Sequence, residues 1–553
     1  MNQCNAALQA ALLRYREGDL QQAERTCLDA LRECPEDARL FHLLGVIHMG
    51  MKKYSSAIEH MRRALQINKS YPEAFNNLGL ALREVGLPDE AIHSFRKALA
   101  FRPDCAETLN NLGLALREAG QPNEAVLALQ KALNLRADYP EALNNLGLVL
   151  RDEGLWEEAA LAFRRALHFR PDYTEALNNL GLALHDRGEF DAAIIIYKQA
   201  LQLKPDYASA CNNLGNTLKS AGRHQEAIAL YRRAVRINPD YAEAHWNMAM
   251  ALLLTGDFTE GWKEYEWRRR LKDFGPSQNT DKAPLWDGSA VTGRTILLRT
   301  EQGFGDNIQF IRYADLLSRR GARVIVECRQ EMAELLKRAE GVSEVAVRGG
   351  PVPDHDFYCP LLTLPLLFCT LKETIPGRTP YLSADPSLVS AWHNKIQSSA
   401  HGLKVGIAWA GTYPPGKSCS LNDLAPLSDI TPVTFYSLQK GGSAQEAITP
   451  PAYMRLVDMT GGLHDFADTA ALIENLDLVI SIDTAVAHLA GALNKTTWVL
   501  LHSDADWRWL LHREDSPWYP SMRLFRRAAW ESWPAVTARI KDELAHLCSR
   551  KAQ

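Results

Sequence analysis

The stretch from Asp477 to Gly491, DLVISIDTAVAHLAG, joins a buried-strand pattern to side chains that suit an anion. Its first half is a run of apolar and β-favouring residues, which predicts a strand covered on both faces. Asp483 and Thr484 follow at the carboxyl end of that strand, and His488 lies one turn into the helix predicted to begin there. In open α/β sheets ligands bind at this edge, and the unpaired N–H groups of a helix N-terminus favour phosphate. The stretch therefore predicts an anion site for a nucleotide-linked substrate.

Strands alternating with helices surround this stretch and would have to position it. The pattern begins with a strand at Thr295–Thr300, passes through the glycine loop Glu301–Asp306, and continues in a helix predicted over 307–319. Further strands are predicted at 324–328, 345–348, 356–358, 404–409, 433–438, 455–459, 478–482 and 497–501. Such alternation favours parallel sheets covered on both faces, here in two units joined near residues 383–402. Their strand ends would face each other across a cleft.

The first half of the chain repeats itself every 34 residues. Asn-Asn-Leu-Gly recurs at Asn76, Asn110, Asn144, Asn178 and Asn212, and a period of this length predicts a solenoid of stacked helical hairpins. The pattern resembles the tetratricopeptide repeat, with about seven repeats and a capping unit over residues 1–271. The last copy is rich in bulky aromatic residues, which suits a terminal repeat that packs on something else. Residues 272–293, where Gly, Pro, Ser, Asn and Asp accumulate, are predicted to be a linker.

The second asparagine of each pair recurs at one repeat position. These residues are Asn77, Asn111, Asn145, Asn179, Asn213 and, in register, Asn247. If that position faces the concave side, its amides would form a ladder able to bind an extended peptide backbone. The arrangement resembles the asparagine ladder of the O-linked N-acetylglucosamine transferase superhelix. The alternative is that asparagine is simply common in the repeat consensus, so peptide binding is one of two interpretations.

Four segments carry a wider resemblance, which covers the chain from about residue 4 to residue 548. They read EQGFGDNIQFIRY, SLQKG, DTAVAHLAGA and SPWYP. Together they resemble a bacterial family in which tetratricopeptide repeats are joined to a heptosyltransferase-like glycosyltransferase domain. The resemblance implies an α-solenoid followed by a GT-B pair of Rossmann-type units, with residues 294–385 on the acceptor side and 403–553 on the nucleotide-sugar donor side. It implies metal-independent, inverting transfer from a nucleotide-diphosphate sugar, without a cofactor, to a protein or peptide recruited by the repeats.

By position, the resemblance assigns the catalytic base to Asp306, in the loop that also holds Gly303 and Gly305. An inverting transfer needs a base to take the proton of the acceptor hydroxyl as it attacks the anomeric carbon. The alternative for Asp306 is the N-cap of the following helix, which its position suits equally.

The same resemblance assigns donor binding to Asp483, Thr484 and His488. Thr484 and the N–H groups after it would hold the phosphates, and His488 would offset the leaving charge. The alternative for His488 is a buried histidine bonded to a backbone carbonyl. Further donor contacts are predicted at Thr412, Lys417, Gln439 and Lys440. The chain departs from the family here, because Lys417 stands where relatives carry an arginine, and a lysine binds phosphate only as a point charge.

The composition limits the partners and the compartment. Lys and Arg number 62 and Asp and Glu 66 among 553 residues, a net charge of −4, which gives no support for nucleic acid or an anionic membrane. We expect no signal peptide and no transmembrane segment, and ten scattered cysteines favour a reducing cytoplasm. The Asp-x-Asp patterns at Asp354–Asp356 and Asp504–Asp506 are expected to be loop or cap residues and not a metal site.

Two functions from different classes follow from these patterns. The first is the glycosyltransferase that the resemblance implies, and the intact motifs at Asp306 and His488 favour it. The second is a catalytically inactive scaffold that keeps the transferase fold and binds protein partners through its repeats. The departure at Lys417 and the small size of the first α/β unit favour the scaffold.

Overall fold

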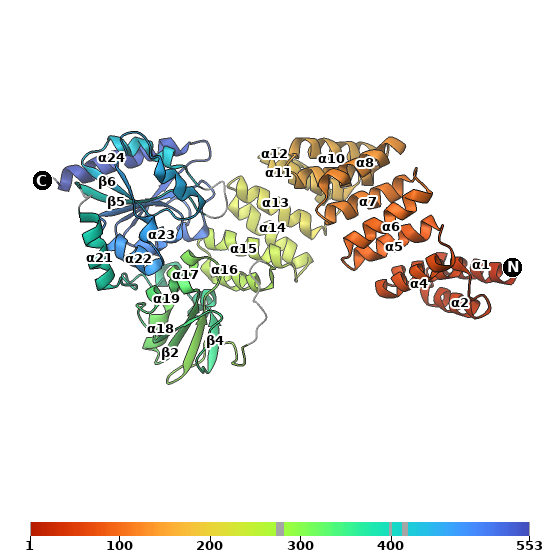
Figure 1. Cartoon of the computed structure of the whole chain (residues 1–553), viewed down its shortest axis with the longest axis horizontal. Helices are drawn as coiled ribbons and strands as arrows, with labels where there is room; N and C mark the ends of the chain where they lie inside the picture. Colours follow the sequence, from red (N-terminus) through yellow and green to blue (C-terminus); the bar gives the residue numbers. More distant parts are fainter. Residues whose placement is uncertain (1, 273–280, 398–400, 412–417, 552–553) are drawn as a thin grey trace. The chain divides into compact units, whose positions relative to one another are not determined.

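The computed structural model describes residues 2–272, 281–397, 401–411 and 418–551. Thr412 and Lys417, two of the predicted donor contacts, lie outside these residues. The chain forms two compact units, Met1–Glu226 and Ala227–Gln553. The first is built of helical hairpins, and the second joins further hairpins to two parallel sheets (Figure 1).

Short glycine turns and close helix packing shape the hairpins of the first unit. Gly154, with φ of +75°, follows α9, because a residue with a Cβ rarely adopts this left-handed turn. Inside the same hairpin Gly147 packs on the ring of Phe163, where an added Cβ would lie 2.6 Å from a ring carbon. The helices are α1 (Asn2–Arg16), α2 (Leu20–Glu33), α3 (Ala38–Gly50), α4 (Tyr54–Ile67), α5 (Pro72–Glu84), α6 (Pro88–Phe101), α7 (Ala106–Glu118), α8 (Pro122–Leu135), α9 (Pro140–Asp152), α10 (Trp156–Phe169), α11 (Thr174–Asp186), α12 (Phe190–Leu203), α13 (Ala208–Ser220) and α14 (His224–Ile237), which spans the boundary.

The asparagine pairs tie successive repeats together. In each bond the side-chain nitrogen of the second asparagine donates to the side-chain oxygen of the first asparagine in the preceding repeat. The bonds run from Asn111 to Asn76, Asn145 to Asn110, Asn179 to Asn144 and Asn213 to Asn178, at 2.8–3.2 Å. Asn77 makes the corresponding bond to His42 at 2.9 Å. Because a carboxamide has two N–H groups, the ladder stabilises the array with one of them, and peptide binding by the other stays a prediction.

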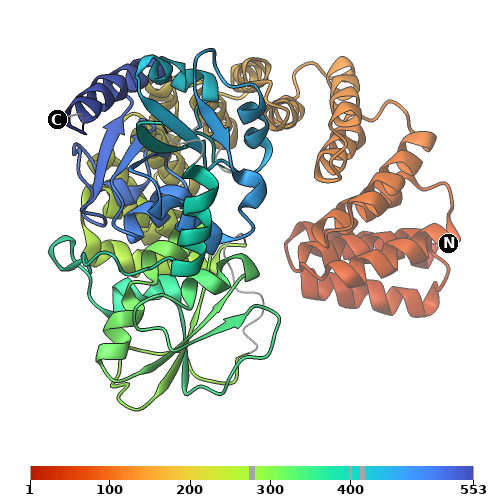
Figure 2. The same ribbon diagram turned by 60° about the vertical axis from the view of Figure 1, so that its left-hand side comes forward.

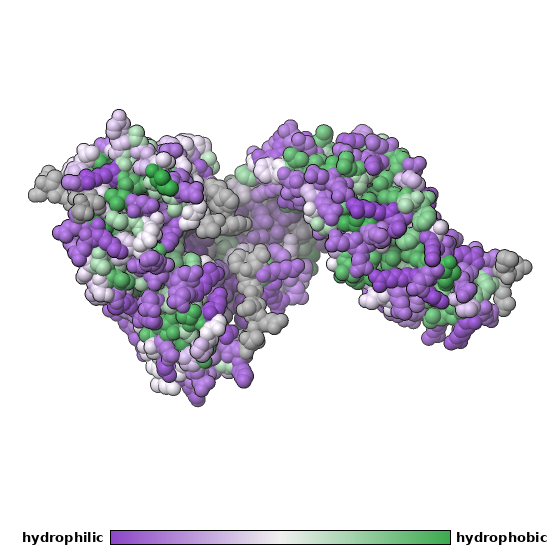
Figure 3. All heavy atoms as spheres, in the orientation of Figure 1, coloured by the Kyte–Doolittle hydropathy of each residue, from purple (hydrophilic) through white to green (hydrophobic). Residues whose placement is uncertain are grey.

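Apolar side chains also reach the surface of the first unit. Leu127, Leu161 and Ile195 recur every 34 residues on α8, α10 and α12 and are 58–60% exposed. In the space-filling view, apolar residues are interspersed with polar ones over the solenoid helices (Figure 3). Leu127, Leu161 and Ile195 thus form an apolar row at equivalent positions in the second helices of three successive repeats.

The last hairpin belongs to the second unit. It comprises α15 (Ala242–Thr255), α16 (Phe258–Tyr265) and the short helix η1 (Glu266–Arg270), and its apolar side chains share one core with both sheets. Trp262 is buried, and its indole nitrogen donates to the backbone oxygen of Thr370 at 2.9 Å. The prediction that the aromatic last copy packs on something else is confirmed. For the same reason the compact units divide near Ala227 and not at residues 272–293.

The first sheet has four parallel strands in the order β3-β2-β1-β4. Side chains of β1 alternate between two cores, with Ile296 and Leu298 in one and Leu297 in the other, so the sheet is covered on both faces. The strands are β1 (Thr295–Arg299), β2 (Arg323–Cys328), β3 (Glu344–Val347) and β4 (Phe357–Pro360), and the helices are α17 (Phe304–Phe310), α18 (Tyr313–Arg319), α19 (Gln330–Leu336) and α20 (Leu364–Leu367).

The single helix predicted over 307–319 is wrong. The structure interrupts it between α17 and α18, where the side chain of Arg312 donates to the backbone oxygen of Gln309 at 2.7 Å. That carbonyl would accept from the N–H of Tyr313 in a continuous helix, so the buried arginine takes over the acceptor and the helix restarts.

The second sheet has six parallel strands in the order β10-β9-β8-β5-β6-β7. Its strands are β5 (Leu403–Ala408), β6 (Val433–Ser437), β7 (Leu456–Asp458), β8 (Leu478–Ile482), β9 (Thr497–Leu501) and β10 (Met522–Arg526). Helices α22 (Phe466–Glu474) and α23 (Ala485–Ala492) contribute to one core, α24 (Trp533–Lys551) contributes to the other, and α21 (Pro386–Gln397) packs on α22. The edge strand β10 was not predicted, because its charged residues hide the apolar pattern of a buried strand. The parallel α/β architecture is confirmed.

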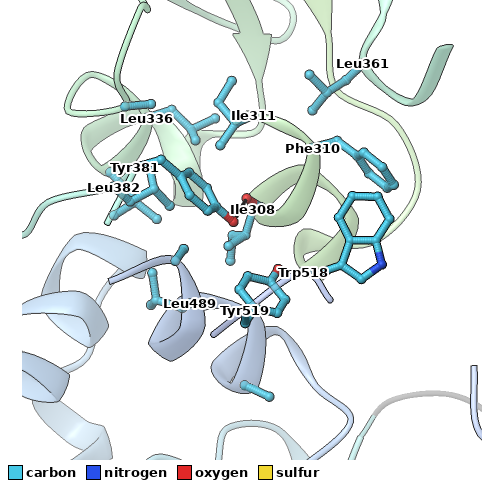
Figure 4. Close-up of a cluster of buried hydrophobic side chains, with 14 of the residues drawn as sticks. Ile308, Phe310, Ile311, Leu336, Leu361, Tyr381, Leu382, Leu489, Trp518 and Tyr519 are labelled. Carbon is cyan, nitrogen blue, oxygen red and sulfur yellow. Dashed lines mark hydrogen bonds between the residues drawn. The ribbon is translucent and has the colours of Figure 1, made fainter. Parts of the chain in front are cut away.

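One continuous core joins the two sheets, which lie in separate layers of the second unit (Figure 2). The guanidinium of Arg312, which is buried, crosses this core and donates to the backbone oxygen of Trp518 at 2.8 Å and to the hydroxyl of Tyr381 at 2.9 Å. The close-up in Figure 4 labels the side chains that meet there: Ile308, Phe310, Ile311, Leu336, Leu361, Tyr381, Leu382, Leu489, Trp518 and Tyr519. This shared core fixes how α17 and α23 face each other.

Two findings bear on the environment of the chain. Among the described residues, none of the helices is both long enough and apolar enough to cross a membrane. Cys4 and Cys34 form a disulfide between α1 and the end of α2, a pairing that the scattered cysteines did not predict.

Candidate functional site

A cavity of about 800 Å³ lies between the two sheets of the second unit. Its walls come from loops that follow the carboxyl ends of strands in both sheets. The lining includes the loop after β1, the start of α23 after β8, and the turn after β9. In parallel α/β proteins this is where ligands bind, so the predicted site residues are brought to one place.

The N-terminus of α23 opens into this cavity. Thr484 is the N-cap residue, with extended backbone angles, and makes no side-chain cap to the helix. Its hydroxyl instead lies 3.0 Å from that of Ser481. The N-cap side chain therefore leaves the first N–H groups of this eight-residue helix uncapped, which is the arrangement that favours an anion.

His488 is held in a fixed orientation one turn further on. It is buried, its Nδ1 lies 2.9 Å from the hydroxyl of Tyr519, and its ring stacks on Trp509 with centroids 5.4 Å apart. Burial raises the pKa of Tyr519 well above its usual value, so the phenol keeps its proton and can donate it to Nδ1. That bond leaves Nε2 as the N–H group, 3.6 Å from a carboxylate oxygen of Asp483. The alternative of a histidine bonded to a backbone carbonyl is not what the structure shows.

Asp483 stands at the mouth of the cavity. Its side chain is 35% exposed. Burial is the largest single influence and raises the pKa of this carboxyl group, but hydrogen bonding and charge from His488, with contributions from Trp509 and Arg508, together bring the pKa below its usual value. The group is therefore an anion that orients His488.

Asp306 faces the same cavity from the first sheet. Its Oδ2 accepts the backbone N–H of Gly303 at 2.8 Å, and its Oδ1 accepts from the guanidinium of Arg508. Gly303, and not Asp306, is the N-cap of α17, and Asp306 closes a capping box from the third helical position. The alternative that Asp306 is the N-cap residue is therefore wrong. Its carboxylate still stabilises the start of α17, from the third helical position.

Arg508 is the residue of the site that the sequence motifs missed. It lies in η8 (Trp507–Trp509), and it pairs with Asp506 at 2.7 Å as well as with Asp306. Burial lowers the pKa of its guanidinium, but the charges of Asp506 and Asp306 raise the pKa by more than burial lowers it. The net pKa lies above the usual value, so the group stays charged. The sequence did hold a signal for this residue: Arg508 stands between two tryptophans, shortly after the pattern Asp504-Ala-Asp506. That pattern was weighed only as a metal site.

The remaining predicted contacts line the cavity in different ways. Gln439 is buried, and its carboxamide accepts from the backbone of Trp409 and Ala410 and donates to the backbone oxygens of Ala410 and Lys440. It therefore holds the loop after β5 in place. The ammonium of Lys440 donates to the backbone oxygen of Leu463. Contact of either side chain with a donor stays a prediction.

The Asp-x-Asp patterns have separate local roles. Asp356 accepts from the backbone N–H of Thr295 at 2.8 Å and pairs with Arg294. Asp506 accepts from the backbone N–H of Arg508 at 3.0 Å. Within the described ranges, three or more His, Cys, Asp or Glu side chains nowhere gather in a group that could hold a metal ion.

Gly305 is where the two halves of the site touch. An added Cβ would lie 2.8 Å from Cδ2 of His488. We expect Gly305→Ala to separate α17 from α23 and to destabilise the second unit by about 1–3 kcal/mol, the usual cost of overpacking. The thermal midpoint of the variant measures this effect. Gly461→Ala is the matched control, since a Cβ added there would meet no atom within 4 Å; equal midpoints for the two variants would contradict the close approach.

The family models match residues of the solenoid. A tetratricopeptide repeat family model matches residues 36–104, 70–138 and 172–240, and a second one matches residues 111–174. Protein FlbA of Caulobacter vibrioides is 27% identical over 340 residues, 54% of this chain and 54% of the relative, so the chain spans about half the length of the curated relative that it matches.

Among solved structures, a tetratricopeptide repeat protein from Parabacteroides merdae is 16% identical and has a TM-score of 0.40, covering 46% of this chain and 100% of that one. YrrB, a repeat protein with an unusual peptide-binding site, is 24% identical with a TM-score of 0.28, covering 34% of this chain and 96% of that one. The family models and the helical hairpins together identify the N-terminal part of this chain as an array of tetratricopeptide repeats.

Proposed function

We propose that this protein is a metal-independent, inverting glycosyltransferase with a GT-B arrangement of its two α/β halves. One observation carries the proposal. A helix N-terminus beside a fixed histidine and a carboxylate from the opposite sheet line one cavity at the carboxyl ends of the strands. This combination suits a nucleotide-diphosphate sugar and an attacking hydroxyl.

The proposed chemistry uses each group once. The diphosphate binds at the first N–H groups of α23, and His488 donates a hydrogen bond to the charge that develops on the leaving group. The acceptor oxygen forms a bond to the anomeric carbon, and the bond from that carbon to the phosphate oxygen breaks with its electron pair on the diphosphate. The hydroxyl proton passes to Asp306. No cofactor takes part.

The repeats supply the acceptor side of the proposal. Arrays of tetratricopeptide repeats suggest protein or peptide partners, and the asparagine ladder is the surface proposed for recruitment. The compartment is proposed to be the cytoplasm, although a disulfide such as Cys4–Cys34 is unusual in a reducing environment.

A second candidate function, the inactive scaffold, is favoured by the ion pair at Asp306. A base whose two oxygens already accept hydrogen bonds from Gly303 and Arg508 is not free to meet a hydroxyl. In a scaffold this pair would be permanent and would only join the two halves.

The proposal is tested by the thermal stability of the full chain. The melting temperature is measured with nucleoside diphosphates and nucleotide sugars, without added metal. A ligand at 100 times its dissociation constant stabilises the native state by about 2.7 kcal/mol. We expect one nucleotide sugar to raise the melting temperature of the wild type and to lose that effect in His488→Ala. The matched control is His546→Ala, whose side chain is exposed on α24. No shift from any compound, or an equal shift in His488→Ala, would favour the scaffold.

A further inference from the structure

Arg508 joins the two carboxylates that approach the cavity from its two sides. One guanidinium nitrogen donates to Asp506, on the same turn, and the other to Asp306, on the opposite sheet. The side chain is only 9% exposed, and its Nε is buried without a hydrogen-bond partner among the described residues. The residue lines the cavity, and its Nε–H is a donor that the described residues leave unused and that solvent does not reach.

Arg329 and Lys440 are the other Arg and Lys side chains among the described residues that line this cavity. Arg329 lies over the ring of Phe304, 5.1 Å from its centroid, and Lys440 donates to a backbone carbonyl. The charge of Arg508, in contrast, reaches the start of α23, because it contributes to the lowered pKa of Asp483. Arg508 thus lies within electrostatic reach of Asp483, at the start of α23, and pairs directly with Asp306.

We propose that Arg508 changes partners during the reaction. It pairs with Asp306 before a nucleotide sugar binds in the cavity, and it pairs with the diphosphate afterwards. A guanidinium binds phosphate through two parallel hydrogen bonds, and the leaving diphosphate carries more charge than one carboxylate. The exchange releases one oxygen of Asp306 for the acceptor hydroxyl. Donor binding therefore precedes activation of the acceptor, and the free enzyme keeps its base covered.

The geometry around Arg508 suits such a movement. Its guanidinium lies over the ring of Trp507, 4.5 Å from the centroid, and that ring packs edge-on against Trp262 at 5.2 Å. An aromatic face holds a cation without a directional bond. The charge can therefore move between acceptors while the ring keeps its position.

This inference rests on the proposed function. Binding of nucleoside diphosphates tests the inference about Arg508 and the proposed function separately. UDP, ADP, GDP and CDP are titrated into the full chain by calorimetry. For the nucleotide that binds the wild type, we expect Arg508→Ala to raise the dissociation constant at least about tenfold, as for a lost charged hydrogen bond. Arg508→Lys should give a smaller increase. Arg539→Ala, which removes an arginine paired with Glu531 on the surface, should give none.

A second variant gives a result that a purely structural arginine would not. Asp306→Asn weakens the hold on Arg508, so it should tighten nucleoside diphosphate binding several-fold, and this gain should vanish in the Arg508→Ala background. An unchanged dissociation constant in Arg508→Ala, or an equal effect of Asp306→Asn in both backgrounds, would overturn the exchange. Should Arg508→Ala unfold, Arg508→Lys supplies the second background. A wild type that binds none of the four nucleotides would instead remove the proposed function itself.

Discussion

Replacing Asp306 by asparagine is expected to lower the rate of sugar transfer by about 10²–10⁴-fold, the usual contribution of a catalytic base. The carboxamide has nearly the same shape and still offers an oxygen to the N–H of Gly303, so α17 should keep its start. It cannot take a proton from the acceptor hydroxyl. The loss should therefore fall on turnover, while binding of the nucleoside diphosphate should not weaken and, with Arg508 released, should tighten.

The measurement is release of nucleoside diphosphate from the nucleotide sugar that stabilises the wild type, with and without acceptor. Asp315→Asn provides the control, because Asp315 pairs with Arg319 on α18 and does not line the cavity. Turnover of Asp306→Asn within a few-fold of the wild type would remove Asp306 as the base. A wild type that binds a nucleotide but never turns it over would favour the scaffold.

The repeat and strand patterns were readable because they are local. A 34-residue period fixes the hairpins, and apolar runs such as Leu478–Ile482 fix a strand that is buried on both faces. Strand β10 was not predicted because Arg523 and Arg526 interrupt its apolar residues, although Met522 and Leu524 pack in one core and Phe525 in the other. The interruption of the helix at Arg312 was not predicted either. Tertiary packing decides that its side chain donates to the backbone oxygen of Gln309, and a local pattern does not contain that information.

The site divides in the same way. The order strand, Asp483-Thr484, helix predicted the helix N-terminus and His488, because all of these are neighbours in the chain. The ion pair between Asp306 and Arg508 joins residues 202 positions apart. No spacing rule connects them, and only the shared core of the two sheets brings the turn after β9 to the loop after β1. A sequence argument could find each carboxylate and miss the arginine between them.

The last hairpin of the solenoid shows how a repeat becomes part of the α/β half. Trp262 occupies the core that covers both sheets, Tyr265 donates to the side chain of Gln302 at 3.4 Å, and Arg268 is fully buried between Glu301 and Glu266. Gln302 and Glu301 belong to the loop that carries Asp306. The hairpin therefore ends the array and also contacts the proposed catalytic loop through Gln302 and Glu301.

Trp262→Ala should consequently destabilise the second unit by about 3–5 kcal/mol, the range for a large buried aromatic side chain. The change leaves a cavity beside Trp507 and removes the hydrogen bond to Thr370. Thermal unfolding of the full chain measures it, with the transition of the second unit followed separately from that of the repeats, because a chain with two compact units need not unfold in one step.

Trp530→Ala is the matched control, because that side chain is 89% exposed and its loss should change stability by no more than about 0.5 kcal/mol. If Trp262→Ala unfolds at the same temperature as the control, the hairpin is a passive end of the solenoid. If it lowers the midpoint while the transition of the first unit stays in place, the hairpin belongs energetically to the α/β half. A fragment meant to carry the proposed activity would then have to begin before α15, and not at the predicted linker.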